Sequence, residues 1–129
     1  MKTILKLCCV FFLSQSFQCE DQIVEKSRTD YINQLQNEKQ FILDYIASFS
    51  CNENIGCSSI AFGSKPCGGP WEYLAHSNAV DIVYLTNLVT NYNALEASYN
   101  DAFEIVSDCA VVNPPSTINC IDGVCTIIH

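Results

Sequence analysis

The chain has 129 residues, enough for one domain, and its formal net charge is −8. Without residues 1–18, which have the layout of an export signal, four basic residues stand against fourteen acidic ones, a net charge of −10. This charge repels nucleic-acid backbones and anionic lipid surfaces, and no basic stripe offsets it, so we expect no nucleic-acid partner.

Residues 1–18 are typical of a secretory signal peptide. Lys2 and Lys6 form a basic start, an apolar run follows at 7–13, and small serines come before position 18. The apolar run is too short to cross a bilayer, which needs about 20 apolar residues. The sequence therefore predicts an exported protein.

Cys19 stands at the junction between this signal and the mature chain. The position resembles that of a lipidated cysteine in bacterial lipoproteins, and Glu20 and Asp21 resemble the acidic stretch that follows it in surface lipoproteins of Bacteroidetes type. Gln18 departs from the pattern, which has a small residue there. Two alternatives stay open: a lipid anchor at Cys19, which would be the only link to a membrane, or ordinary cleavage with Cys19 free or paired to another chain.

Two long amphipathic helices are predicted after a polar tether at 19–29. The first is capped by Ser27 or Thr29 and has apolar residues at helical spacing from Tyr31 to Phe49.

The second helix is expected from Asp81, with Asn78 or Asp81 as its cap, to about Asp108. Its length would be about 40 Å at 1.5 Å per residue. The two apolar stripes can bury each other, so the sequence predicts a mainly α domain at 30–129: an antiparallel helical hairpin with a disulfide-braced loop between the helices.

The loop is the stretch Cys51–Leu74, CNENIGCSSIAFGSKPCGGPWEYL, with four of the five glycines and the only tryptophan. Two interpretations of its aromatic residues stay open. The aromatic side chains of Phe62, Trp71 and Tyr73, with Lys65 nearby, would form a rigid binding patch. Alternatively, Trp71 and Phe62 would cover the open end of the two-helix core.

The tail after Cys109 is expected to be extended, because Pro114 and Pro115 stop helical structure. Asp122-Gly123 between two apolar runs predicts a short β-hairpin, in which Cys120 faces Cys125.

Six cysteines outside the signal and Cys19 form an even set, which in a short exported chain predicts three disulfides. They are Cys51, Cys57, Cys67, Cys109, Cys120 and Cys125. The leading connectivity pairs Cys57 with Cys67 and joins both Cys51 and Cys109 to the tail hairpin. An alternative pairs Cys120 with Cys125, and Cys51 with Cys109. Because the loop holds three cysteines, at least one bridge must leave it.

No catalytic, cofactor or metal site is predicted. His76 has Ser58, Ser59 and Ser77 nearby in the sequence, but no G-x-S-x-G motif accompanies them. The cysteine spacings contain no C-x-x-C pair and match no common zinc pattern. We therefore expect a protein that is not an enzyme.

The run IAFGSKPCGGPWEYL, followed by VDIVYLTNLVTNYNALEASYN and by C-I-D-G-V-C, resembles a group of small exported or lipoprotein-like bacterial proteins. The resemblance covers about residues 50–125 and implies an exported, disulfide-bonded helical module without an attached activity. The sequence thus predicts a non-enzymatic binding or structural module for an unknown protein or surface component. The alternative is an inhibitor of an extracellular hydrolase.

Overall fold

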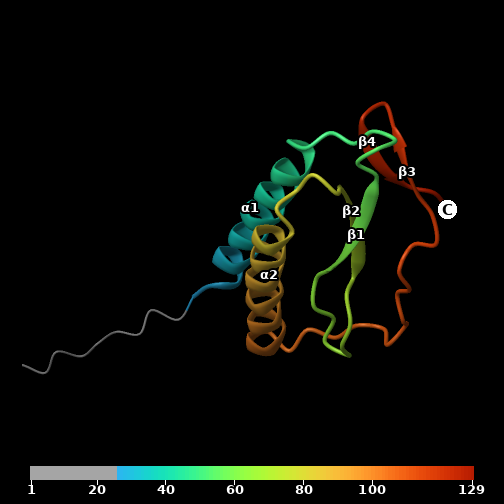
Figure 1. Ribbon diagram of the computed structural model, residues 1–129. Coiled ribbons are helices and arrows are strands. Elements are labelled where there is room, and N and C mark those ends of the chain that lie inside the picture. The colour runs from blue at the N-terminus through green and yellow to red at the C-terminus, as the bar shows by residue number, and fades with distance from the viewer. Residues whose placement is uncertain (1–25) are drawn as a thin grey trace, which may run out of the picture.

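Two helices, α1 (Arg28–Ala47) and α2 (Ile82–Ala102), run antiparallel beside each other (Figure 1). The computed structural model describes residues 26–129, so the expectations for the signal peptide and for Cys19 lie outside the described range. Within this range, neither helix combines the length and the apolar character that a membrane crossing requires.

Both helices begin at the residues that the sequence favours as caps. The Ser27 hydroxyl accepts the Asp30 N–H at 3.2 Å, and the Asp30 carboxylate accepts the Ser27 N–H at 3.2 Å, which completes a capping box. At α2, the Asp81 carboxylate accepts the N–H groups of Val83 and Tyr84 at 3.0 and 3.1 Å.

The prediction of a mainly α domain is wrong, because the stretch expected to be a loop contains a β-hairpin and the fold is mixed α/β. The strands are β1 (Cys57–Phe62) and β2 (Glu72–Ser77), which pair antiparallel. The glycine- and proline-rich part occupies only the connection between them, residues 63–71. The segments on either side are therefore free to form strands.

The hairpin supplies the layer that two helices alone would lack. Ile60 pairs with Leu74 in the register, and Phe62 lies two residues along on the same face, toward the helices. Phe62 stacks on Tyr92 with 4.3 Å between the ring centroids. The buried apolar core comprises Leu35, Ile42, Phe62, Leu74, Val80, Leu85, Val89 and Tyr92.

Helix α2 ends at Ala102 rather than near Asp108, so its predicted length was too great. Glu104 has a φ of 48°, a left-handed conformation that ends helical structure. The chain after it is drawn toward the β1–β2 connection by a disulfide at Cys109. This tertiary contact overrides the helical periodicity that continues in the sequence.

The tail ends in a second hairpin, β3 (Ile118–Ile121) and β4 (Val124–Ile127), at the opposite end of the molecule from the β1–β2 connection (Figure 1). Cys120 faces Cys125 in the expected register. Asp122 and Gly123 both have positive φ, 51° and 82°, as a two-residue type I′ turn requires.

Six cysteines form three disulfides, and each bridge joins the 51–67 stretch to the tail, so both predicted connectivities are wrong. The pairs are Cys51–Cys120, Cys57–Cys125 and Cys67–Cys109. Cys67 cannot pair with Cys57 because β1 carries it to the far end of the hairpin. Only the link from Cys51 to the tail hairpin was anticipated. We call the adjacent bridges Cys51–Cys120 and Cys57–Cys125 the tail clamp.

Candidate functional site

The connection between β1 and β2 is held by a row of polar side chains on α2. The Gly63 N–H donates to Asn93 Oδ1 at 2.8 Å. The Ser64 N–H donates to Glu96 Oε2 at 2.5 Å, and Asn100 Nδ2 donates to the Ser64 carbonyl at 2.7 Å. Spacings of three and four residues place these three side chains on one face of the helix. The helix therefore fixes the backbone of the connection at consecutive residues.

Lys65 extends this attachment into the segment after α2. Its ammonium donates to Asp108 Oδ1 at 3.0 Å and to the Ala110 carbonyl at 2.9 Å. The residue is only 7% exposed, and its Nζ lies 5.2 Å from the centre of the Trp71 ring. Lys65 therefore holds the connection to the tail and does not present its charge to a partner.

Cys67 and Cys109 complete the attachment, and both are exposed. We call the whole set of contacts the loop clamp: Gly63, Ser64, Lys65 and Cys67 with their partners Asn93, Glu96, Asn100, Asp108 and Cys109. Each of these four residues thus has a partner outside the hairpin, so the first half of the connection, residues 63–67, is fastened to the rest of the protein.

Trp71 lies at the end of the clamped connection and remains 40% exposed. The backbone N–H of Trp71 donates to the Phe62 carbonyl at 2.9 Å. Its ring crosses close to Gly63, where a Cβ atom would lie 2.6 Å from Trp71 Cδ1. Gly63 also has a φ of +90°, which side chains rarely adopt. Glycine is therefore required at position 63 for the indole to sit where it does.

The three residues of the expected binding patch differ in their surroundings. Lys65 is buried, Trp71 is exposed, and Tyr73 is half-buried in β2 opposite Ala61. Phe62, which was expected either beside Trp71 in the patch or as part of a cover, is fully within the core.

The clamp also perturbs two ionisable groups. Burial raises the pKa of the Glu96 carboxyl above its ordinary value, while the Ser64 N–H and Lys39 act in the opposite direction. Burial, followed by the nearby carboxylates of Glu96 and Glu72, raises the pKa of Tyr92 to about 12. The Tyr92 phenol is thus neutral at physiological pH.

Sequence reasoning did not identify Asn93, Glu96 and Asn100 as partners of the connection. Their helical spacing on one face of α2 was the available signal, since a polar row beside an apolar stripe can bind backbone groups. The spacing could not show which backbone groups these side chains would bind, because those groups belong to the β1–β2 hairpin, which was not predicted.

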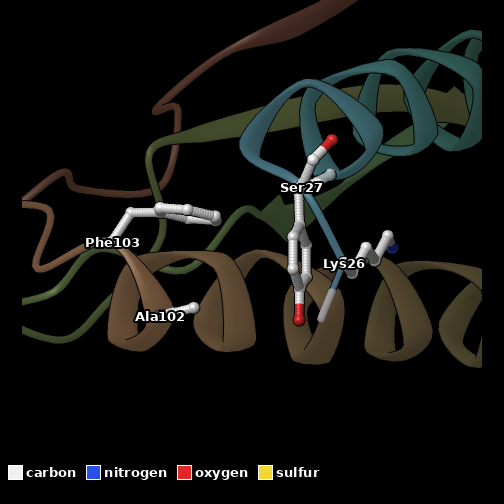
Figure 2. Close-up of a pocket in the computed structure, with 5 residues that line it drawn as sticks. Lys26, Ser27, Ala102 and Phe103 are labelled. Atoms are coloured by element: carbon white, nitrogen blue, oxygen red, sulfur yellow. The ribbon is translucent and has the colours of Figure 1, made fainter. Parts of the chain in front are cut away.

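An open cavity of about 390 Å³ lies where α1 begins and α2 ends (Figure 2). Tyr31 and Phe103 meet edge to face with their ring centroids 5.8 Å apart. Lys26 Nζ lies 4.1 Å from the centre of the Tyr31 ring. The Ser27 hydroxyl in its lining is engaged in the capping box. These contacts close the end of the helix pair, and we assign them a structural role.

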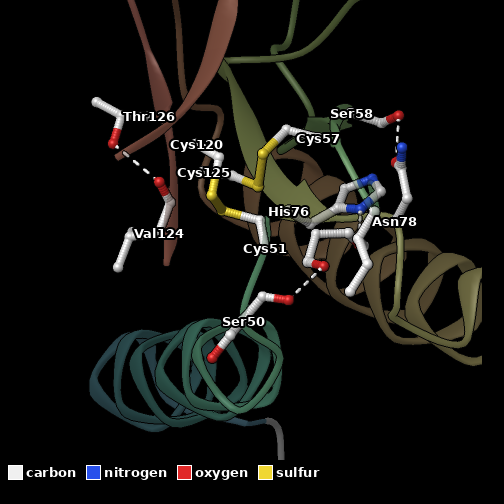
Figure 3. Close-up of a disulfide and its surroundings, with 12 residues drawn as sticks. Ser50, Cys51, Cys57, Ser58, His76, Asn78, Cys120, Val124, Cys125 and Thr126 are labelled. Carbon is white, nitrogen blue, oxygen red and sulfur yellow. Dashed lines mark hydrogen bonds between the residues drawn. A yellow bond between two sulfur atoms is a disulfide. The ribbon is translucent and has the colours of Figure 1, made fainter. Parts of the chain in front are cut away.

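His76 and its neighbouring serines do not assemble a hydrolytic triad in the described chain (Figure 3). His76 is 3% exposed, and its Nδ1 lies 3.0 Å from the Ser77 carbonyl, to which it donates. Ser58 faces His76 across the hairpin, but its hydroxyl donates to Asn78 Oδ1 at 2.6 Å. The Ser77 hydroxyl donates to the Ser50 carbonyl. Neither Ser58 nor Ser77 therefore donates its hydroxyl to His76, as a hydrolytic triad would require.

The sulfur atoms of the tail clamp lie close together. Those of Cys51, Cys57 and Cys125 are all within 4.8 Å of one another. Each belongs to a disulfide, so no thiolate is available to bind a metal ion.

Comparison of the chain with protein-family models, with curated proteins and with solved structures finds no match.

Proposed function

We propose that the chain is an exported, non-enzymatic binding module that recognises a protein or a surface component through Trp71. The observation that carries this proposal is the contrast at the end of the connection: an indole that is 40% exposed stands on backbone held by the loop clamp. Three disulfides are consistent with an oxidising, extracellular location.

A rigid aromatic anchor is well suited to binding. Tryptophan is enriched among the few interface residues that contribute most of the binding free energy. Ordering a flexible loop on binding costs free energy, and a loop that is already fixed avoids most of that cost. The loop clamp thus serves recognition by positioning Trp71 before a partner arrives.

The test is capture of extracellular material by the immobilised, disulfide-intact protein. We expect Trp71→Ala to lose the captured component and Val111→Ala, at an 83% exposed position on the tail, to retain it. Circular dichroism would show that both variants are folded. Retention of the component by folded Trp71→Ala would contradict the proposal.

A second candidate function is inhibition of an extracellular hydrolase. It is favoured by residues 66–69, which are all exposed and lie at the Cys67–Cys109 bridge. A short exposed segment held by a disulfide is suited to enter the active site of a protease. The oxidised protein should then inhibit at least one member of a panel of serine, cysteine and metal-dependent extracellular hydrolases, and the reduced protein should inhibit it less. No inhibition across the panel would contradict this function.

A further inference from the structure

A small hollow lies at the end of the molecule opposite to the β1–β2 connection (Figure 1), between the last turn of α1, β2 and the tip of the β3–β4 hairpin. Its volume is about 150 Å³. Leu43, Ile46 and Phe49 line it on the helix side, Val124 lines it on the hairpin side, and the buried His76 and Ser77 line it from β2. This volume is large enough for one large apolar side chain.

Aromatic side chains continue this surface away from the hollow. Phe49 meets Tyr45 edge to face at 5.2 Å between centroids, and Tyr45 meets Tyr84 in the same way at 5.0 Å. We call the hollow and this row of side chains, Phe49, Tyr45 and Tyr84, the apical groove. It is formed by four segments of the chain: the end of α1, β2, the start of α2 and the tip of the β3–β4 hairpin.

The charges around the apical groove are of one sign. Asp44, Asp81 and Asp122 are exposed on the segments that form it. All four lysine and arginine side chains of residues 26–129 contact other parts of the protein. Those contacts are Lys26 with Tyr31, Arg28 with Tyr99, Lys39 with Glu72 and Lys65 with Asp108. A ligand at the groove therefore meets carboxylates without a competing cation from the described chain.

We propose that the apical groove binds a basic, amphipathic polypeptide segment, which places one large apolar side chain in the hollow and its cations beside Asp44 and Asp122. Apolar contact supplies the affinity, and the opposite charges select a basic partner over an acidic one. This surface is distinct from Trp71 and goes beyond the function proposed above. The two ends of the molecule then bind independently.

The experiment uses a fluorescein-labelled synthetic peptide of lysine and leucine in an amphipathic pattern, and a matched peptide with glutamate in place of lysine. Fluorescence anisotropy with the disulfide-intact protein should detect binding of the lysine peptide alone. Added salt should weaken that binding, because exposed charges are screened. Equal binding of the two peptides would overturn the proposal.

Ala47→Leu tests the hollow itself. Ala47 lines the hollow at the exposed end of α1, so leucine fills the space without disturbing the core. We expect binding of the lysine peptide to weaken at least about tenfold, as for loss of a central anchor contact. The matched control is Ala94→Leu, on the exposed surface of α2, which should bind as the unchanged protein does. Equal affinity of the two variants would contradict an anchor in the hollow.

Asp44→Asn with Asp122→Asn provides a second test that leaves the hollow intact. Asparagine tolerates the positive φ of position 122, so the hairpin turn is kept. The double variant should bind the lysine peptide more weakly and with less dependence on salt. An unchanged salt dependence would overturn the assigned role of these carboxylates. Trp71→Ala should leave peptide binding unchanged, which separates this proposal from the proposed function.

Discussion

The two ends of the β1–β2 hairpin are fastened by different chemistry. At the tail clamp, Cys57 of β1 is bridged to β4, and the buried Cys51, which precedes β1, is bridged to β3. At the loop clamp, backbone hydrogen bonds to α2 and a buried lysine share the task with one exposed disulfide. One end thus depends on covalent bonds, and the other on polar contacts that single substitutions can remove.

This difference follows from what each end has to hold. The β3–β4 hairpin has only four residues in each strand, and an isolated two-stranded hairpin is at best marginally stable in water. Disulfides compensate for its small buried surface. The β1–β2 connection lies directly against α2, whose side chains can satisfy its backbone groups. Cross-linking is therefore needed less there.

The largest expected effect comes from removing a bridge of the tail clamp. Cys51→Ala with Cys120→Ala should lower the free energy of unfolding by about 2–5 kcal/mol, because Cys51 is buried and the short β3–β4 hairpin is then held by the Cys57–Cys125 bridge alone. Cys67→Ala with Cys109→Ala should cost less, because the polar contacts of the loop clamp remain. Urea unfolding of both double variants gives the comparison. A larger loss for Cys67–Cys109 would reverse our ranking of the two clamps.

Gly63→Ala should produce the next largest effect. A left-handed backbone position disfavours alanine, and here the new methyl group would also meet the Trp71 ring. We expect a loss of about 1–3 kcal/mol, measured by thermal and urea unfolding. Gly68→Ala is the matched control, since Gly68 has a similar φ of +93° and open space around it. Equal losses for the two variants would show that the contact with Trp71 does not matter.

Lys65→Met separates the charge of the loop clamp from its packing. Methionine keeps an apolar stem but loses the contacts with Asp108 and the Ala110 carbonyl, which should cost about 1–2 kcal/mol of unfolding free energy. The loss stays moderate because Asp108 is exposed and water can solvate its carboxylate.

The control for Lys65→Met is Lys39→Met, which removes a half-exposed ion pair with Glu72. Exposed pairs contribute little, so the loss should stay below about 1 kcal/mol. Denaturant midpoints of the two variants, measured side by side, test the difference. If Lys39→Met were the more damaging substitution, the buried lysine would not be the main charged contact holding the connection.

Local signals in the sequence were sufficient for the parts of the fold that depend on neighbours in the chain. The caps at Ser27 and Asp81 and the turn at Asp122-Gly123 are set by short-range hydrogen bonds and by backbone preference. The even set of cysteines predicted three disulfides correctly.

The parts that failed depend on contacts between distant segments. The strands β1 and β2 have six residues each, and the cysteines, glycines and prolines around them suggested a loop. Without that hairpin, Cys67 could not be placed near Cys109, and Lys65 was assigned to the surface although it is buried. One missed strand pair thus accounts for the errors in connectivity and in the candidate site.

The smallest expected effect is a change in pH dependence on Glu96→Gln. Because burial raises the pKa of Glu96 in the folded state, the folded protein binds its proton more tightly than the unfolded chain does. The Glu96 contribution to stability is therefore full below the ordinary carboxyl pKa and declines as pH rises through the raised value.

Glutamine does not titrate but can still accept the Ser64 N–H. The stability of the unchanged protein relative to the variant should thus fall between acidic and neutral pH, as followed by urea midpoints across that range. The capping carboxylate of Asp30, whose pKa is lowered by its contacts with Ser27, acts in the opposite sense but is common to both proteins and cancels in the difference. A difference that is constant, or that grows with pH, would mean that the carboxylate is held in the loop clamp more favourably than its burial implies.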